Sequence, residues 1–306
     1  MPVSHNLRGA LFMVVSMIGF TTNDAITKFC SESMNMAQVM LVRGIFATFL
    51  VATLAWHRGA LASPRLMLQP FVLLRVAGEV GGTVTFLIAL AHLPIGNVSA
   101  ILQSLSLAVT MGAALVFGEK VGWRRWLAIA AGFAGVLIVV RPGFSGFDVY
   151  SLIALACVGF CAVRDLATKR IPAEVPTLLV STATSAAMVV VGALVLKPMG
   201  GWTPMTPAST GLLALAAILV VIGYQFIIQA MRTGEISFIA PFRYTSLIWS
   251  MFLGLVVFSE RPDTPMLVGS AIIVCSGLYA LYRERLSARP RAAPKRAGPA
   301  LEPEGI

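Results

Sequence analysis

Seven charged side chains lie inside long apolar stretches of the sequence, where a charge is costly and therefore indicates chemistry. A carboxylate in such a place can carry a proton or bind a basic group, and a guanidinium can bind an anion or a planar ring. Each charge can also be held by a partner of opposite sign, so each has a structural alternative. The acids are Asp24, Glu79 and Asp165, and the bases are Arg43, Arg75, Arg164 and Arg243.

Two of these acids belong to a repeated pattern. The sequence D-x-x-T-K occupies residues 24–28 and, 141 positions further on, residues 165–169. The same offset relates residues 116–120 to residues 257–261, so the chain consists of two related halves. Residues 116–120 and 257–261 each have a glutamate at the fourth position, Glu119 and Glu260. We expect both glutamates to mark structural helix ends.

The acid of each D-x-x-T-K copy has two interpretations. It either pairs with the lysine four residues on, at the end of a helix, or serves as a proton or substrate site. Asp24 follows neutral Asn23, whereas Asp165 follows Arg164. Because its charge is less compensated, Asp24 is the copy that we expect to be functional.

A second acid has a base on its own helix face. Arg75 and Glu79 are spaced i, i+4 and can form an ion pair. Gly78 and Gly82 beside them have the G-x-x-x-G spacing that lets another helix approach closely. The pair either stabilises packing alone, or Glu79 is a carboxylate for a proton or a substrate.

The surroundings of Arg243 favour a solute site. Pro241 removes a backbone donor and disturbs the helix there, and Tyr244 and Trp249 add aromatic surface. Arg243 either lines a translocation cavity or pairs structurally with Glu79 or Asp24. Glutamine and tyrosine side chains elsewhere serve as interhelical hydrogen bonds or as substrate contacts. The complete set of candidate substrate-binding residues is Asn23, Asp24, Arg43, Glu79, Gln103, Tyr224, Gln225, Arg243, Tyr244 and Trp249.

The composition indicates a membrane protein. The chain is 58% hydrophobic and 12% charged, with a mean hydropathy of +0.86, which is more apolar surface than one soluble core can bury. Its net charge of +10 could suggest nucleic acid, but six of the 23 basic residues follow Tyr282. Such a tail is typical of a cytoplasmic segment beside anionic lipid, so we expect a lipid bilayer and no nucleic acid as partner.

The apolar runs predict an all-α polytopic protein of ten transmembrane helices. With both termini cytoplasmic, most basic residues lie inside, and only Lys28, Arg141, Lys197 and Arg261 lie outside. Since five spans is an odd number, the halves at residues 7–141 and 147–283 form an inverted repeat, followed by a disordered basic tail at 284–306. The predicted spans are 7–28, 36–56, 71–93, 97–118, 123–140, 149–168, 177–196, 210–231, 236–258 and 265–282.

Two stretches resemble a known family. Residues 118–143 and 259–282, each a glutamate followed by a Gly-rich helix, resemble the closing segments of EamA repeats in the drug/metabolite transporter superfamily. Span four departs from the family because it lacks the proline that span nine has at Pro241. The resemblance covers residues 7–283 and implies a ten-span carrier whose cavity is lined by spans one, three, four, six, eight and nine. Asn23-Asp24 and Val42-Arg43-Gly44 look most like the riboflavin and S-adenosylmethionine uptake members.

The sequence therefore predicts a secondary active transporter of a small organic metabolite in a cell inner membrane. Asp24 or Glu79 is the candidate site of proton coupling. A slight positive excess within the spans favours a neutral aromatic or anionic, riboflavin-like substrate over S-adenosylmethionine. An S-adenosylmethionine or amino-acid carrier, a channel and an intramembrane enzyme are the alternatives. No enzymatic activity, cofactor or metal is expected, and a homodimer is left open.

Overall fold

The computed structural model describes residues 5–61, 63–119, 121–142, 147–172, 174–233 and 236–288. Ten of its helical stretches are long and apolar enough to cross a membrane, in agreement with the predicted number. The first five spans are α1 (His5–Ser31), α2 (Met36–His57), α3 (Pro70–His92), the broken pair α4 (Ile95–Leu102) and α5 (Leu105–Phe117), and α6 (Trp123–Val140). The second five are α7 (Val149–Thr168), α8 (Thr177–Leu196), α9 (Pro207–Thr233), the broken set α10 (Ile236–Ile239), η2 (Ala240–Tyr244) and α11 (Thr245–Phe258), and α12 (Thr264–Ala288).

Local signals set many of the helix ends. Asn35 caps α2 by accepting from the Gln38 N–H, and Asp148 caps α7 by accepting from the Tyr150 N–H. Pro70 opens α3, where its missing N–H has no helical partner to lose. A short 3-10 helix, η1 (Pro64–Leu68), links α2 to α3.

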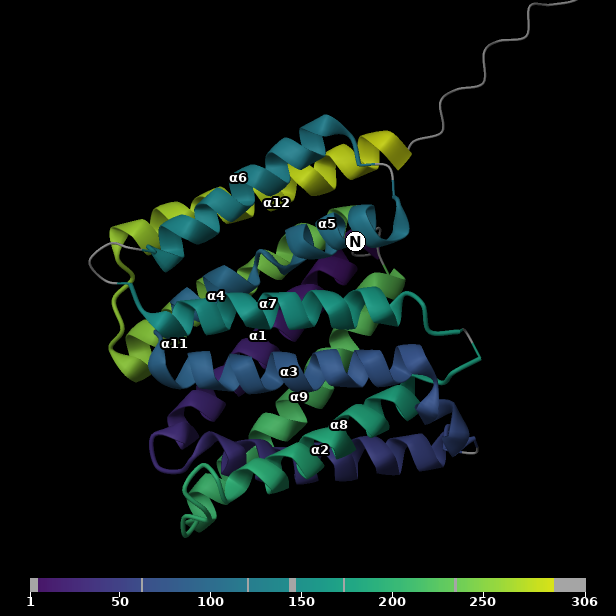
Figure 1. Ribbon diagram of the computed structural model, residues 1–306, viewed down its shortest axis with the longest axis vertical. Coiled ribbons are helices and arrows are strands. Elements are labelled where there is room, and N and C mark those ends of the chain that lie inside the picture. The colour runs from purple at the N-terminus through teal and green to yellow at the C-terminus, as the bar shows by residue number, and fades with distance from the viewer. Residues whose placement is uncertain are drawn as a thin grey trace, which may run out of the picture.

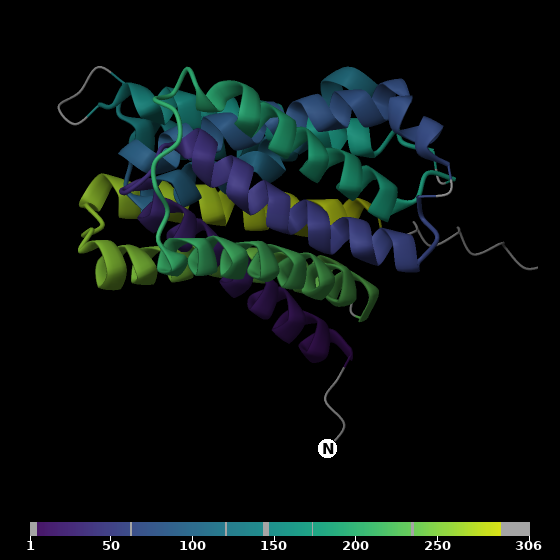
Figure 2. The same ribbon diagram turned by 90° about the horizontal axis from the view of Figure 1, so that it is seen from below.

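The helices form a layered bundle with its spans side by side (Figure 1). Helices α6 and α12 lie at one edge and α2 and α8 at the other, with α3 and α7 between them (Figure 1). Helix α1 begins on the same side of the bundle on which α12 ends (Figure 2). We term this the N-side and the opposite side the far side. Helices α1 and α7 cross in opposite directions, as an inverted repeat requires.

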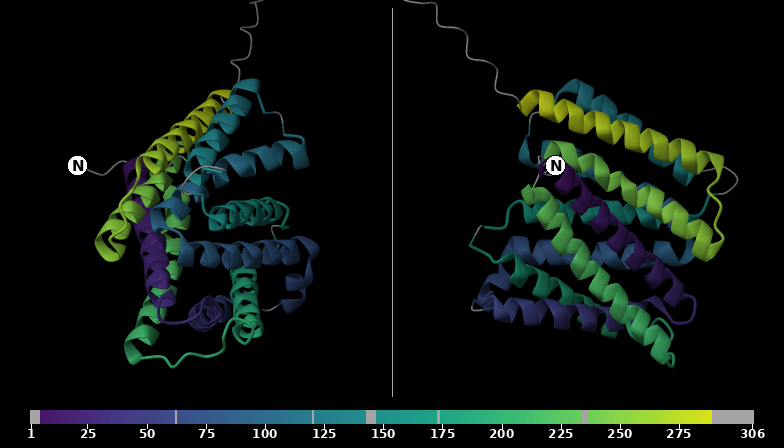
Figure 3. Two further views of the ribbon diagram at one scale, coloured as in Figure 1. Left: turned by 60° about the vertical axis from the view of Figure 1, so that its left-hand side comes forward. Right: turned by 180° about the vertical axis from the view of Figure 1, so that it is seen from behind.

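Contacts between the halves follow an approximate two-fold relation. Span two packs on span seven as α2 on α8, and span five packs on span ten as α6 on α12. Span one packs on span eight as α1 on α9 (Figure 3), and its counterpart is span six on span three, α7 on α3. The large interhelical contacts thus join one half to the other, so the halves interdigitate.

Glycines allow the closest approaches. A Cβ on Gly78 would lie 2.9 Å from the Arg164 backbone nitrogen, and one on Gly135 would lie 2.9 Å from the Gly269 carbonyl oxygen. A Cβ on Gly82 would lie 3.0 Å from the Cys161 sulfur. The G-x-x-x-G prediction for α3 is therefore confirmed, with α7 as the helix that approaches.

Spans four and nine are both interrupted near their middles. Span nine breaks at Pro241, as the sequence predicts, and passes through the 3-10 segment η2. Span four breaks at Gln103 and Ser104 although no proline is present there. The two breaks end within one position of equivalence, since α5 begins at Leu105 and α11 at Thr245, 140 residues further on.

Some predicted boundaries shift. Helix α12 continues to Ala288, beyond the predicted span end at Tyr282 and into the stretch predicted to be disordered. The remainder of the predicted tail, residues 289–306, lies outside the described residues, as does Lys120.

Candidate substrate-binding site

Asn23 connects an arginine to an aspartate between α1 and α2. One guanidinium nitrogen of Arg43 donates to Asn23 Oδ1 at 3.2 Å and lies 3.4 Å from Thr27 Oγ1. The Asn23 amide in turn donates to Asp24 Oδ1 at 2.9 Å. Asn23 is buried and Asp24 is partly exposed. The buried amide therefore orients a guanidinium and a carboxylate side by side without a direct ion pair between them.

The alternative in which Asp24 pairs with Lys28 is wrong. Lys28 Nζ instead binds Glu260 Oε1 of the other half at 2.5 Å. Its counterpart Lys169 likewise faces Glu119 rather than Asp165. The lysines point away from their own aspartates because each finds a carboxylate at the end of a span in the opposite half.

Glu79 lies between two arginines. Arg75 approaches its Oε2 at 3.9 Å, which confirms the predicted i, i+4 pair. Arg164 of α7 contacts both carboxylate oxygens at 3.4 Å and also binds Asp165 at 2.8 Å. Arg75 donates to Thr184 of α8 at 2.8 Å. Glu79 therefore links three spans through the charges on its two sides.

Tyr224 interacts electrostatically with both groups of charges. Its hydroxyl lies within electrostatic reach of Glu79, Arg164, Arg75 and Arg43. Its ring packs edge-on against Phe20 with centroids 5.1 Å apart, yet 49% of the residue is exposed. We name the set the central charge cluster. It consists of Asn23, Asp24, Arg43, Arg75, Glu79, Arg164, Asp165 and Tyr224.

The two helix breaks meet each other. Gln103 donates from the break in span four to the Ser246 hydroxyl just after the break in span nine, at 2.7 Å. Trp249 donates to Thr22 of α1 at 3.0 Å and stacks on Phe252 with ring centroids 5.0 Å apart. The broken spans are thus tied both to one another and to α1.

Two candidate residues carry no such partner. Arg243, in η2, is exposed, and the described residues provide it with no ion pair. The alternative that it pairs with Glu79 is wrong, because Glu79 is bound by Arg75 and Arg164. Gln225 on α9 is exposed as well. The Tyr244 hydroxyl, by contrast, packs against Gly277 of α12 in the space a side chain would need.

Arg75, Arg164 and Asp165 belong to the cluster but are not among the candidate residues that the sequence predicts. The available signal was the adjacency of Arg164 and Asp165 in a copy of the repeat, which places a base and an acid opposite Glu79 once the halves interdigitate. The described residues contain no group of three or more histidine, cysteine or acidic side chains that could hold a metal ion.

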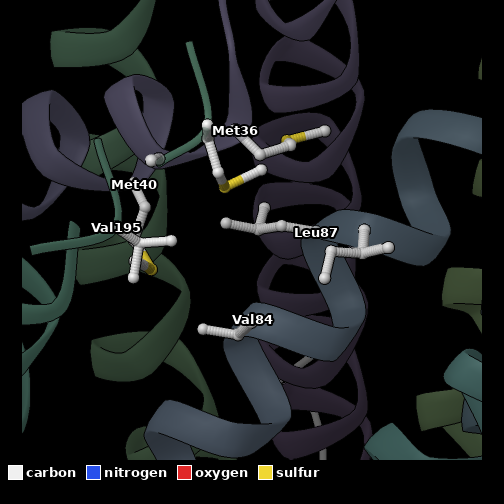
Figure 4. A pocket seen from close by; sticks show the side chains of 8 residues that line it. Met36, Met40, Val84, Leu87 and Val195 are labelled. Carbon is white, nitrogen blue, oxygen red and sulfur yellow. The ribbon is translucent and has the colours of Figure 1, made fainter. Parts of the chain in front are cut away.

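An apolar pocket lies away from the charge cluster, between α2, α3 and the end of α8 (Figure 4). Met36, Met40 and Leu87 point into it (Figure 4). Its lining offers hydrocarbon and thioether surface but no polar group that could orient a solute. The lining residues are Met36, Ala37, Met40, Val84, Leu87, Ile88, Val195 and Met199.

Ten apolar helices enclosing a cluster of charged side chains define a multi-pass membrane protein of the transporter class. The model of the EamA-like transporter family matches residues 7–141. The chain is 28% identical to a riboflavin transporter of Vibrio cholerae, over 93% of this chain and 96% of that protein. The chain thus resembles EamA-like membrane transporters, by the family match over residues 7–141 and by relatives that align along nearly its whole length.

Other relatives have different named substrates. An S-adenosylmethionine uptake transporter of Rickettsia felis is 25% identical over 91% of this chain and 94% of its own length. A pseudopaline exporter of Pseudomonas aeruginosa is 24% identical over 87% of this chain and 93% of its own length. One solved crystal structure shares the fold, with a TM-score of 0.63 and 20% identity over 92% of this chain. The relatives thus agree on transport and differ in solute and direction.

Proposed function

We propose that this protein is a secondary active transporter that carries a small organic metabolite, riboflavin-like in character, across the inner membrane by alternating access. The observation that carries the proposal is the meeting of two broken spans, joined by the Gln103–Ser246 hydrogen bond. Discontinuous helices at the interface of inverted repeats are where secondary transporters bind their solutes. The N-side is cytoplasmic in this proposal, as the distribution of basic residues favours.

The balance of charged side chains within the spans supports a neutral aromatic or anionic solute. The central charge cluster holds three acids (Asp24, Glu79, Asp165) and three arginines (Arg43, Arg75, Arg164), so it balances itself. The exposed Arg243 is then a positive charge in excess. Arg243 binds a carboxylate, a phosphate or a polarised carbonyl, while Tyr244, Trp249 and Tyr224 provide surfaces on which a planar ring stacks.

The direct test is binding and uptake by purified protein reconstituted in liposomes. Riboflavin uptake should saturate, and unlabelled S-adenosylmethionine should compete poorly because its sulfonium is repelled by the excess positive charge. Efficient binding of S-adenosylmethionine together with no flavin binding would replace riboflavin by S-adenosylmethionine as the solute. The relatives named S-adenosylmethionine uptake transporters support this second candidate.

Proton coupling belongs to the same proposal. Asp24 is the candidate carrier because, among the described residues, its carboxylate has only the Asn23 amide as a direct partner, whereas Glu79 is held by two arginines. A pH gradient should accelerate uptake by the wild-type protein, and Asp24→Asn should transport without responding to the gradient. If the wild-type protein and Asp24→Asn are equally indifferent to the gradient, transport is not proton-coupled.

A further inference from the structure

Two ion pairs join the halves of the molecule and are related by the internal repeat. Lys28 of the first half binds Glu260 of the second, and Lys169 of the second half faces Glu119 of the first. Lys28 and Lys169 are 141 residues apart, and so are Glu119 and Glu260. The same lysine and the same glutamate therefore meet twice, with the halves exchanged.

The backbone around the two glutamates is also repeated. Each follows a residue in the left-handed conformation, Gly118 with φ 66° and Ser259 with φ 55°. The amide of Glu119 donates to the Ala113 carbonyl at 3.4 Å, and the amide of Glu260 donates to the Gly254 carbonyl at 2.9 Å. These helix endings place the two carboxylates equivalently, so a difference between the ion pairs reflects how the halves approach.

Aromatic partners complete the repeated motif. Lys28 Nζ lies 5.2 Å from the ring centroid of Phe258. At the equivalent Phe117, the cation is Arg170, the neighbour of Lys169, at 4.4 Å. At both sites a cation of one half thus covers an aromatic ring of the other.

The two sites differ strongly in closure. Lys28 and Glu260 are 2.5 Å apart with side chains only 10% and 20% exposed. Lys28 also donates to the Leu93 carbonyl at 2.5 Å, and Glu260 accepts from the Ile95 N–H at 2.9 Å. Lys169 and Glu119 are 3.6 Å apart with side chains 51% and 53% exposed. The first pair is desolvated and fully bonded, whereas the second is a hydrated contact of little strength.

These sites lie on opposite sides of the bundle. The connection from α11 to α12, which carries Glu260, is on the far side, and the connection from α5 to α6, which carries Glu119, is on the N-side (Figure 1). Other bonds between the halves also close the far side. Gln38 exchanges two hydrogen bonds of 2.8 Å with the Thr203 backbone. The far side is therefore held together by buried bonds between the halves, while the repeated motif on the N-side is open to water.

We propose that Lys28–Glu260 and Lys169–Glu119 are the two gates of the transport cycle, and that the structure has the far gate closed and the N-side gate open. This inference rests on the proposed function, because gates matter only to a carrier. In the opposite state the halves exchange geometries: Lys169–Glu119 closes and is desolvated, and Lys28–Glu260 separates and is hydrated. Since both gates use the same chemistry, losing one pair is offset by gaining the other, so neither state is strongly preferred.

Spin-label distances test the gate assignment without any substrate. One pair of labels at Glu32 and Arg261 spans the far side, and a second pair at Arg124 and Glu174 spans the N-side, after the four native cysteines are replaced by serine. Glu260→Gln should lengthen the far-side distance and shorten the N-side distance. The matched control Glu119→Gln should leave both distances as in the wild type. Unchanged distances in Glu260→Gln, or lengthening on both sides, would overturn the proposal.

A second set of variants changes only the exposed pair, where folding is tolerant. Glu119→Lys faces Lys169 with a like charge, so it should prevent closure of the N-side. Label distances should stay as in the wild type while uptake is lost, and the charge swap Glu119→Lys with Lys169→Glu should restore uptake. Full uptake by Glu119→Lys contradicts the gate. If the protein carries no flavin at all, the proposed function fails, but the label distances still decide whether the gates exist.

Discussion

Arg243 is the residue whose role depends most on the solute. It is exposed within a broken span and, in the described part of the chain, forms no ion pair, so its removal should leave the fold intact. The other in-span arginines differ, because Arg43, Arg75 and Arg164 each bond to protein groups.

Arg243→Gln should therefore weaken solute binding without lowering the melting temperature. The loss of one charge-assisted hydrogen bond, about 1.5–3 kcal/mol, corresponds to a Kd increase of roughly tenfold to a hundredfold. Flavin fluorescence quenching measures the Kd. Arg58→Gln, which removes an exposed arginine from the turn after α2, is the control and should bind as the wild type does. Equal affinities of both variants would exclude Arg243 from the site.

For individual residues, the sequence predicts which side chains carry charge but not which carboxylate each basic side chain binds. The Arg75–Glu79 pair could be predicted because it lies on one helix face. The same spacing argument allowed a Lys28–Asp24 pair as one of two interpretations, yet the Lys28 ammonium binds Glu260. Spacing along one helix reveals local pairs, and the pairs between halves required the three-dimensional packing.

The elements depend on close approach at glycine, and α3 against α7 offers a matched comparison. A Cβ on Gly78 of α3 would meet the backbone of Arg164 at 2.9 Å, whereas a Cβ on Gly159 of α7 would meet nothing within 4 Å. Backbone atoms cannot move aside as a flexible side chain can. The two glycines therefore test packing with the same chemical change.

Gly78→Ala should lower the melting temperature in detergent, because forcing the helices apart costs about 1–3 kcal/mol. Gly159→Ala should be neutral or slightly stabilising, since alanine favours the helix by about 0.5–1 kcal/mol. Because α3 carries Glu79, Gly78→Ala should also reduce transport. A Gly78→Ala protein as stable as Gly159→Ala would show that the two helices do not approach as closely as described.

Asp263 joins α6 to α12 on the far side. It forms an ion pair with Arg141 and caps α12 by accepting from the Met266 N–H. Partial burial raises the pKa of Asp263, but the hydrogen bonds from Arg141 and the Met266 N–H outweigh it and hold the pKa below the usual 3.8. A lowered carboxyl pKa stabilises the fold above its unfolded value, and that stability is lost as pH falls through the folded value.

Asp263→Asn should thus lower the melting temperature at pH 7, and this deficit should shrink as the pH falls from about 3.8 through the lower pKa of the folded wild-type carboxyl. Asn still caps the helix, so Asp263→Ala should be worse by about 1 kcal/mol at every pH. Melting curves of the three proteins across pH provide the measurement. A melting-temperature deficit of Asp263→Asn that is independent of pH would show that the Asp263–Arg141 ion pair does not stabilise the fold.

Of the breaks in spans four and nine, only the second could be predicted from the sequence. Pro241 predicts the interruption in span nine. Span four carries no proline, and its break at Gln103 and Ser104 follows from its position opposite span nine, where Gln103 bonds Ser246. The break in span four therefore depends on a tertiary contact and not on a local helix-breaking residue.

For the whole molecule, the ten spans and the two-fold offset could be predicted because bilayer thickness and the 141-residue repeat are both visible in the sequence. The interdigitation of the halves could not, since it depends on which glycine faces meet. Interdigitation explains why the repeated lysines and glutamates pair across halves.

Counterflow is the most direct measurement of alternating access by a carrier. Liposomes loaded with unlabelled riboflavin should accumulate labelled riboflavin transiently above equilibrium, because a carrier exchanges solutes through one site that faces either side in turn. The exchange should saturate with solute concentration. Uptake that rises linearly, with no transient accumulation in loaded liposomes, would contradict a carrier and indicate a channel.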